Sequence, residues 1–242
     1  MTPNSRIVRL GCRDYLVIDL SLPLSLDQQG YPGDFQPTRS VFSDIRQDGW
    51  QHYTHALGDH CFHPHCDAPN HFDTDQQERG MEIYDLSWSF HRACLIDLSG
   101  SPEAAEHEGI RFLTNITKEH LIPFTEILST SEAVIIRTGY DLWSEKNYSH
   151  IPEWIPYLTE EASTFIDSFP GIKVIGTDSL TVDAYGLQVS HLVFKDKMIV
   201  ESLVHLHEIP RENWAGFTFQ TSPVRIVGAT GGPVIAYAYL DI

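Results

Sequence analysis

Short runs of apolar, β-branched residues recur along the chain and restrict it to a strand-rich fold. Such runs, bounded by turn residues, are typical of buried strands. We expect strands at residues 16–20, 94–98, 133–138, 173–178, 198–203, 224–228 and 234–240. Helices are expected after the capping residues Thr117 and Thr159. Because strands outnumber helices and neither a repeat nor a linker divides the 242 residues, the pattern predicts a single α+β domain over residues 1–242.

The segment 61–73 is rich in side chains that bind metals. Pro64 and Pro69 disfavour a helix, so we interpret the segment as extended, with alternate residues on one face. The side chains on that face are Cys61, His63, His65 and Asp67, and His71 follows the turn at Pro69. Imidazole, thiolate and carboxylate are ligands of zinc and its neighbours, so the segment predicts a metal site. The alternative is a surface loop in a chain that has 13 histidines.

Nearby residues of the same types are interpreted differently. Cys66 lies between His65 and Asp67, so on an extended segment it points away from the metal and is expected to pack as a buried thiol. His52, His55 and His60 precede the segment and are not assigned to the site. One of these three is expected to be a core or hydrogen-bonding histidine.

Charge and cysteine content restrict the partners of the chain. A formal net charge of −17 disfavours nucleic acid and anionic membranes, and it selects no particular small-molecule substrate. The four cysteines show no paired framework, which favours a reducing compartment. The N-terminal residues lack the pattern of a signal peptide, and no apolar run approaches about 20 residues. We therefore expect a cytoplasmic protein that acts on a small molecule.

The segment 61–72 also resembles the hallmark His-x-Gly-Thr-His-x-Asp-x-Pro-x-His-Phe. This hallmark belongs to the metal-dependent cyclase family, which includes bacterial kynurenine formamidase and isatin hydrolase. Similar segments follow the family order at residues 18–21, 31–34, 137–140, 156–162, 176–178, 182–183 and 223–228, so the resemblance spans nearly the whole chain. It implies a barrel-like β core with peripheral helices, assembled into a homodimer or homotetramer.

The resemblance further implies one or two divalent ions, zinc or manganese. In the family, the first ion is held by two hallmark histidines and the aspartate, and the second by that aspartate, a later histidine and a glutamate. By position, His65 and Asp67 match the hallmark, and His191 and Glu201 are the later pair. His71 matches the last hallmark histidine, which acts in proton transfer.

One position departs from the family pattern. The first hallmark histidine falls on Cys61, and the Gly-Thr pair falls on His63 and Pro64. One interpretation is that Cys61 or His63 replaces the missing ligand, since a cysteine thiolate is a capable zinc ligand. The others are a single-ion site built on Asp67, His191 and Glu201, and a degraded site with little chemistry.

The resemblance implies a hydrolase that cleaves an amide, cyclic amide or ester bond in a small aromatic or cyclic metabolite, with a metal-activated water as nucleophile. Four aromatic residues are expected to form walls for a flat substrate: Tyr31, Trp143, Tyr148 and Trp154. Two alternatives stay open. One is a biosynthetic cyclase or dehydratase that uses the same site, and the other is a non-catalytic ligand-binding member of the family.

Overall fold

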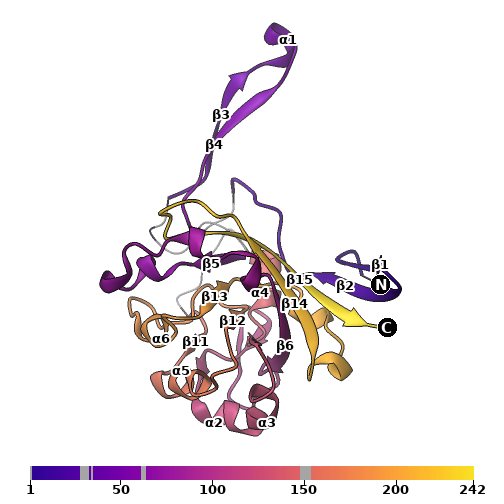
Figure 1. Cartoon of the computed structure of the whole chain (residues 1–242), viewed down its shortest axis with the longest axis vertical. Helices are drawn as coiled ribbons and strands as arrows, with labels where there is room; N and C mark the ends of the chain where they lie inside the picture. Colours follow the sequence, from indigo (N-terminus) through magenta and orange to yellow (C-terminus); the bar gives the residue numbers. More distant parts are fainter. Residues whose placement is uncertain (1, 28–32, 34, 61–63, 148–153) are drawn as a thin grey trace.

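A closed barrel of seven strands forms the centre of the computed structural model (Figure 1), which describes residues 2–27, 33, 35–60, 64–147 and 154–242. The hydrogen-bonded order is β15–β14–β6–β10–β12–β13–β5, and β5 pairs back with β15 to close the ring. The bounds are β5 (His65–Asp67), β6 (Phe90–Asp97), β10 (Ala133–Arg137), β12 (Val174–Thr177), β13 (Met198–Glu201), β14 (Phe217–Pro223) and β15 (Gly231–Asp241). The hairpin of β1 (Ser5–Leu10) and β2 (Arg13–Asp19) extends the sheet from β15.

Four neighbouring barrel strands, β6, β10, β12 and β13, run parallel to one another, and the other pairings in the ring are antiparallel. Parallel strands are covered on both faces, so their sequences are continuously apolar. All five residues of β10 are buried, for example. This composition explains why the apolar runs of the sequence predict these four strands correctly.

Side chains of alternate strand residues divide between two hydrophobic clusters. Leu95, Ile135 and Val200 belong to the cluster that fills the barrel. Ile96, Val134 and Ile199 belong to the second cluster, which also contains Leu121 and Ile166 from the helices. The barrel wall is therefore covered on both sides, and helices cover its outer face in this region.

The helices are short and peripheral. Their bounds are α2 (Lys118–Leu121), α3 (Thr125–Leu128), α4 (Asp141–Asn147), α5 (Glu160–Asp167) and α6 (Val189–Val193). Thr159 caps α5 as expected, because its Oγ1 accepts a hydrogen bond from the backbone N–H of Ala162 at 3.2 Å. The 3-10 turns are η1 (Pro69–His71), η2 (Thr74–Gln76), η3 (Met81–Ile83), η4 (Leu86–Trp88), η5 (Ile122–Phe124), η6 (Leu206–Glu208) and η7 (Arg211–Asn213).

Two small strand pairs complete the periphery, β7 (Ala105–His107) with β8 (Ile110–Phe112) and β9 (Asn115–Ile116) with β11 (Tyr157–Leu158). These elements agree with the expected α+β class with a barrel-like core. Within the described ranges, every helix is too short or too polar to cross a membrane.

A separate two-stranded hairpin projects from one end of the barrel (Figure 1). It consists of β3 (Thr38–Ser43) and β4 (His52–Ala56), and α1 (Ile45–Asp48) lies at its tip. Asp44 caps α1 by accepting a hydrogen bond from the backbone N–H of Arg46 at 2.8 Å, and Gly49 ends it at a φ of 80°. We call residues 38–56 the hairpin arm.

The prediction of a strand at residues 224–228 is wrong. The last strand before β15 is β14, which ends at Pro223, and a loop follows. In this loop Val224, Ile226 and Val227 are 51%, 50% and 82% exposed. The β-branched run therefore carries a strand-like composition but lies on the surface.

Candidate metal centre

The centre is built on two antiparallel neighbours, β5 and β13, on the outer face of the barrel. Glu201 lies opposite His65 in the register of this pair. Cys66 and Val200 point into the barrel core, so the alternation of strand side chains places His65 and Asp67 on the opposite face. His65 Nε2 lies 3.3 Å from Glu201 Oε2 and 3.6 Å from Asp67 Oδ1. The prediction that Cys66 packs as a buried thiol is confirmed.

A short helix, α6, brings a second histidine to the same place. His191 Nε2 lies 3.0 Å from Asp67 Oδ2 and 3.6 Å from Glu201 Oε1. The ring is oriented by Asp183, whose Oδ2 lies 2.6 Å from His191 Nδ1. Asp183 also accepts hydrogen bonds from the backbone N–H groups of Ser190 at 2.6 Å and His191 at 3.3 Å. A buried carboxylate thus fixes the direction in which Nε2 points.

Two further imidazoles lie around Asp67. His60 Nε2 is 3.3 Å from Asp67 Oδ1, and the rings of His60 and His71 are 4.2 Å apart between centroids. Glycine at position 231 makes room for this arrangement, because a Cβ there would lie 2.5 Å from His60 Nε2. His71 stands at the end of η1, beyond Pro69, with its ring centroid 5.9 Å from that of His191.

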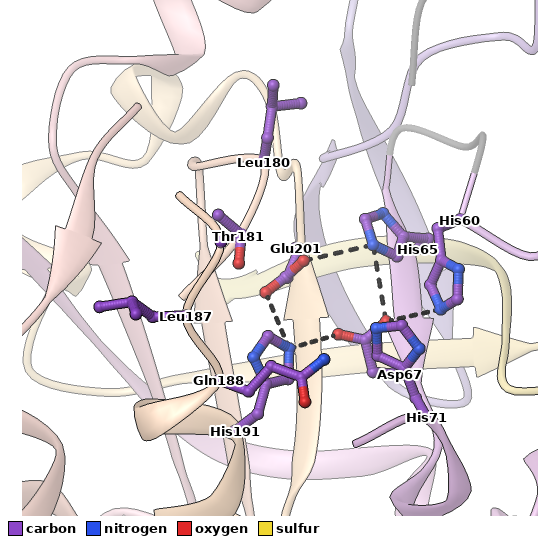
Figure 2. A pocket seen from close by; sticks show the side chains of 11 residues that line it. His60, His65, Asp67, His71, Leu180, Thr181, Leu187, Gln188, His191 and Glu201 are labelled. Carbon is purple, nitrogen blue, oxygen red and sulfur yellow. Dashed lines mark hydrogen bonds and ion pairs between the residues drawn. The ribbon is translucent and has the colours of Figure 1, made fainter. Parts of the chain in front are cut away.

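These side chains line one cavity of about 490 Å³ (Figure 2). Figure 2 shows His65, Asp67, His191 and Glu201 joined into a closed ring of ion pairs and hydrogen bonds, with His60 attached to Asp67. The polar ring occupies one side of the cavity. The remaining lining residues are Leu180, Thr181, Gly186, Leu187 and Gln188.

Two groups of the ring hold opposite charges in the metal-free chain. Burial raises the pKa of Asp67, but the hydrogen bond with His191 and the neighbouring imidazolium charges outweigh it and keep that pKa below its ordinary value. Burial lowers the pKa of His191, but the hydrogen bonds to Asp183 and Asp67 outweigh it and raise that pKa to about 10. Asp67 is therefore ionised and His191 protonated at neutral pH.

Glu201 of the ring and His71 beside it have pKa values that shift in the directions that burial imposes. Burial, followed by the charge of Asp67, raises the pKa of Glu201. Although the His71 side chain is accessible through the cavity, withdrawal from bulk water lowers its pKa to about 4. His71 is therefore a neutral imidazole at pH 7 and can accept a proton.

The structure brings together five residues that the sequence assigns to the site, namely His65, Asp67, His71, His191 and Glu201. Cys61, His63, Tyr31 and Tyr148 lie outside the described residues. Trp143 and Trp154 are not among the residues that line the cavity. Trp143 is 1% exposed and packs edge-on against Trp154 with ring centroids 5.4 Å apart. Their cluster includes Leu180, so it supports the cavity wall from behind.

Sequence reasoning missed two residues of the centre, His60 and Asp183. The hallmark comparison places the first ligand at Cys61, one residue further on, so the sequence alone does not assign His60 to the site. This adjacency is the only sequence signal for His60. Asp183 lies in a segment similar to the family, but its contact with His191 depends on how α6 packs, which spacing does not indicate.

Comparison with known proteins identifies the family. The family model Cyclase matches residues 18–184, which is more than half of the chain. A kynurenine formamidase of Bacillus mycoides (strain KBAB4) is 28% identical over 225 residues, covering 90% of this chain and 95% of the relative. The kynurenine formamidase of Bacillus anthracis is also 28% identical over the same shares of the two chains.

Solved structures share the fold at lower identity. Isatin hydrolase A from Labrenzia aggregata, bound to benzyl benzoate, superposes with a TM-score of 0.73 at 19% identity, covering 93% of this chain and 94% of that one. A potential metal-dependent hydrolase with cyclase activity gives a TM-score of 0.69 at 18% identity, covering 92% and 96%. By its matched family model and its fold, this chain belongs to the cyclase family of metal-dependent hydrolases.

Proposed function

We propose that this chain hydrolyses an amide, cyclic amide or ester bond in a small aromatic or cyclic metabolite, with a metal-activated water as nucleophile. One observation carries the proposal: four imidazoles and two carboxylates, from residues 60–71 and 191–201, converge on one side of a single cavity. Buried groups of this kind are costly unless they are paired or bind a metal. The kynurenine formamidase relatives and the isatin hydrolase neighbours support the substrate class.

The donor set fits one or two divalent ions. Asp67 Oδ1 is buried without a hydrogen-bond partner among the described residues, although two imidazole nitrogens lie within 3.6 Å of it. Two groups have ligand atoms close enough to share an ion, His60 with Asp67 and His71, and His65 with Asp67 and Glu201. Imidazole and carboxylate suit zinc and manganese. We assign His60, His65, Asp67, His191 and Glu201 as the residues that would hold these ions, and Asp67 is a member of both groups.

In this assignment His60 supplies the imidazole that the hallmark places at position 61. It reaches Asp67 Oδ1 at 3.3 Å. Cys61 and His63 remain proposed as additional ligands from the sequence alone. The close approach of Gly231 supports His60, because it keeps the space that this ring occupies free of any side chain.

The residues around the ions have separate tasks. A divalent ion held there would polarise the substrate carbonyl and lower the pKa of the attacking water toward neutrality. His71 would take a proton from the water and return it to the leaving group, because it faces the cavity as a neutral ring. Asp183 holds the Nδ1–H of His191, so that Nε2 stays directed at the ions.

A second reaction, a biosynthetic ring closure or dehydration, uses the same residues in the same positions. The neighbour described as having cyclase activity favours this second candidate. We also propose that the chain acts in the cytoplasm as a homodimer or homotetramer. The thiols of Cys12, Cys66 and Cys94 are unpaired, which suits a reducing compartment.

Metal removal tests the proposed function directly. The chelator-treated chain should lose hydrolysis of an N-formyl arylamine, a cyclic amide such as isatin and an aryl ester, and regain it with Zn²⁺ or Mn²⁺. Two quantities are measured: the steady-state rate with each substrate and the metal content per chain. A chain that binds less than one equivalent of any transition metal would instead support a non-catalytic ligand-binding protein. Ring-closed or dehydrated product without hydrolysis would favour the second reaction.

Metal affinity should rise with pH because of His191. The metal-free ring is protonated at pH 7, since its pKa is about 10, and only the neutral Nε2 binds a metal. One proton must therefore leave, and affinity should increase about tenfold per pH unit between about pH 7 and pH 9. Calorimetric titration in buffers of different ionisation enthalpy measures both the affinity and the released proton.

Asp183→Asn provides the comparison for this measurement, because it removes the charge that holds the proton on His191. The variant should release less than one proton and show a shallower pH dependence. Equal affinity of the unmodified chain at pH 7 and pH 9 would contradict the protonated state of His191.

A further inference from the structure

The side of the cavity that faces the metal centre belongs to one short segment, which connects β12 to α6. Its lining residues are Leu180, Thr181, Gly186, Leu187 and Gln188 (Figure 2). We call these five residues the facing wall. The ring of imidazoles and carboxylates lies on the other side of the cavity, so a substrate that reaches the ions lies between the ring and the facing wall.

Hydrogen bonds tie the segment of the facing wall to the residues that would hold the ions. The backbone N–H of Val182 donates to Glu201 Oε1 at 2.7 Å, and Asp183 Oδ2 accepts from the backbone N–H of His191 at 3.3 Å. Val182 and Asp183 are both buried. The wall is therefore pre-formed beside the metal centre. A pre-formed wall selects substrates by its own chemistry, because it does not reorganise when they bind.

The five residues of the facing wall are uncharged. Leu180 and Leu187 are aliphatic, and Leu187 is 56% exposed, so it presents apolar surface to the cavity. A substrate whose scissile bond lies at the ions places its other end against this wall. A carboxylate at that end would lose water and meet aliphatic carbon, which is costly for an ionised group. The formal charge of −17 on the chain adds repulsion at longer range.

The sequence extends this result to the segments that the structure does not describe. These segments, 28–32, 34, 61–63 and 148–153, contain the acidic residues Asp34 and Glu153 but neither lysine nor arginine. Wherever they lie, they bring no lysine or arginine to a substrate carboxylate.

Gln188 is the polar side chain of the facing wall that stands next to the metal centre, three residues before His191. It begins α6 as the N-cap residue, yet its side chain forms no capping hydrogen bond. Figure 2 shows its amide turned toward Asp67 and His71. An amide can both donate and accept hydrogen bonds, so Gln188 suits an uncharged polar substituent, such as a ketone beside the scissile bond.

We propose that the site selects an aromatic substrate that carries no carboxylate, and that Gln188 forms a hydrogen bond with an uncharged carbonyl substituent of that substrate. The inference rests on the proposed function, because it places the scissile bond at the ions. It goes further by separating compounds of one reaction class. Uncharged aryl amides and cyclic amides are good substrates, whereas their carboxylate-bearing counterparts are poor ones.

Two pairs of compounds test the selection in the metal-loaded, full-length chain. N-formylkynurenine and ortho-formamidoacetophenone present the same formyl arylamine beside the same aryl ketone, and only the first carries an amino-acid end. Isatin and its ring carboxylic acid repeat the comparison for a cyclic amide. In each pair, kcat/KM should be at least about 10-fold higher for the compound without a carboxylate.

The outcomes separate this inference from the proposed function. No hydrolysis of any of the four compounds would contradict the proposed function. Hydrolysis with equal or higher kcat/KM for the carboxylate-bearing member of a pair would overturn the selection alone.

Gln188→Arg supplies a cation at the facing wall. It should raise kcat/KM for N-formylkynurenine by about 10-fold, chiefly through a lower KM, and should leave metal content unchanged. Gln47→Arg is the matched control, because it adds the same charge at an exposed residue of α1, at the tip of the hairpin arm (Figure 1). It should leave both constants unaltered. Identical kinetics of the two arginine variants would show that Gln188 does not contact the substrate.

Gln188→Leu tests the hydrogen bond itself. It should raise the KM of ortho-formamidoacetophenone by about 5–10-fold, whereas the KM of formanilide, which lacks the ketone, should stay the same. An equal rise for both compounds would contradict the assigned hydrogen bond.

Discussion

Asp67→Asn should abolish tight metal binding and, with it, hydrolysis. Asp67 is 2% exposed and its two oxygens face different partners, with Oδ1 toward His60 and His65 and Oδ2 toward His191. The substitution keeps the shape but removes the negative charge that all three imidazoles share. Loss of one partner of a buried charged pair costs about 3–5 kcal/mol, so metal affinity should fall by about 10²–10⁴-fold.

Metal content after dialysis and the titrated dissociation constant measure the effect on binding. Asp75→Asn, the same change at an exposed residue of η2, is the control and should leave both quantities unaltered. Circular dichroism verifies that the buried substitution leaves the barrel folded. A folded Asp67→Asn chain with full metal content would refute the shared position of Asp67.

His71→Ala should lower turnover by about 10²–10⁴-fold while leaving metal content nearly intact. His71 lies among groups that could also hold an ion, together with His60 and Asp67, so metal content separates a proton carrier from a ligand. The pKa of His71 is about 4 in the metal-free chain, and bound cations lower the pKa of a nearby imidazole further. The ring is thus neutral and competent at neutral pH, and it is protonated and inactive only as the pH falls below about 4.

The ratio kcat/KM against pH, measured with one substrate, should therefore show an acid limb that depends on His71. His71→Gln retains hydrogen bonding without proton transfer and should be as slow as the alanine variant. Unchanged turnover in either variant removes His71 from the mechanism. Loss of metal from the alanine variant would make His71 a ligand.

The predictable parts of the fold are those fixed by local composition. The strands β6, β10, β12 and β13 are buried on both faces, so each has a continuous apolar run that sequence reading recognises. The loop 224–228 has the same composition on the surface, and composition alone does not distinguish the two. The closure of the barrel by β5 against β15 depends on long-range pairing that no local pattern encodes.

The candidate site was predictable to the extent that its residues follow a local rule. His65 and Asp67 obey strand alternation, and the resemblance adds His191 and Glu201. The same alternation predicts ligands at residues 61 and 63, whereas the described strand begins at His65. His60 lies in a turn after β4 and outside any strand, so strand alternation does not assign it to the site.

Trp143 shows a different limit of sequence reading. An aromatic residue near a Pro-rich loop suits a substrate wall and a hydrophobic core equally well by composition. The side chain lies on α4 and packs in one buried cluster with Leu180. Only the three-dimensional packing decides between the two.

The short connection between the hairpin arm and the metal centre couples the ordering of the arm to metal binding. Only Leu57, Gly58 and Asp59 separate β4 from His60, and Asp59 is fastened to Thr230 beside Gly231. Any molecule that holds the arm in place also holds the backbone that carries His60. Thermodynamic reciprocity then requires that metal binding strengthen the binding of that molecule by the factor with which the molecule strengthens metal binding.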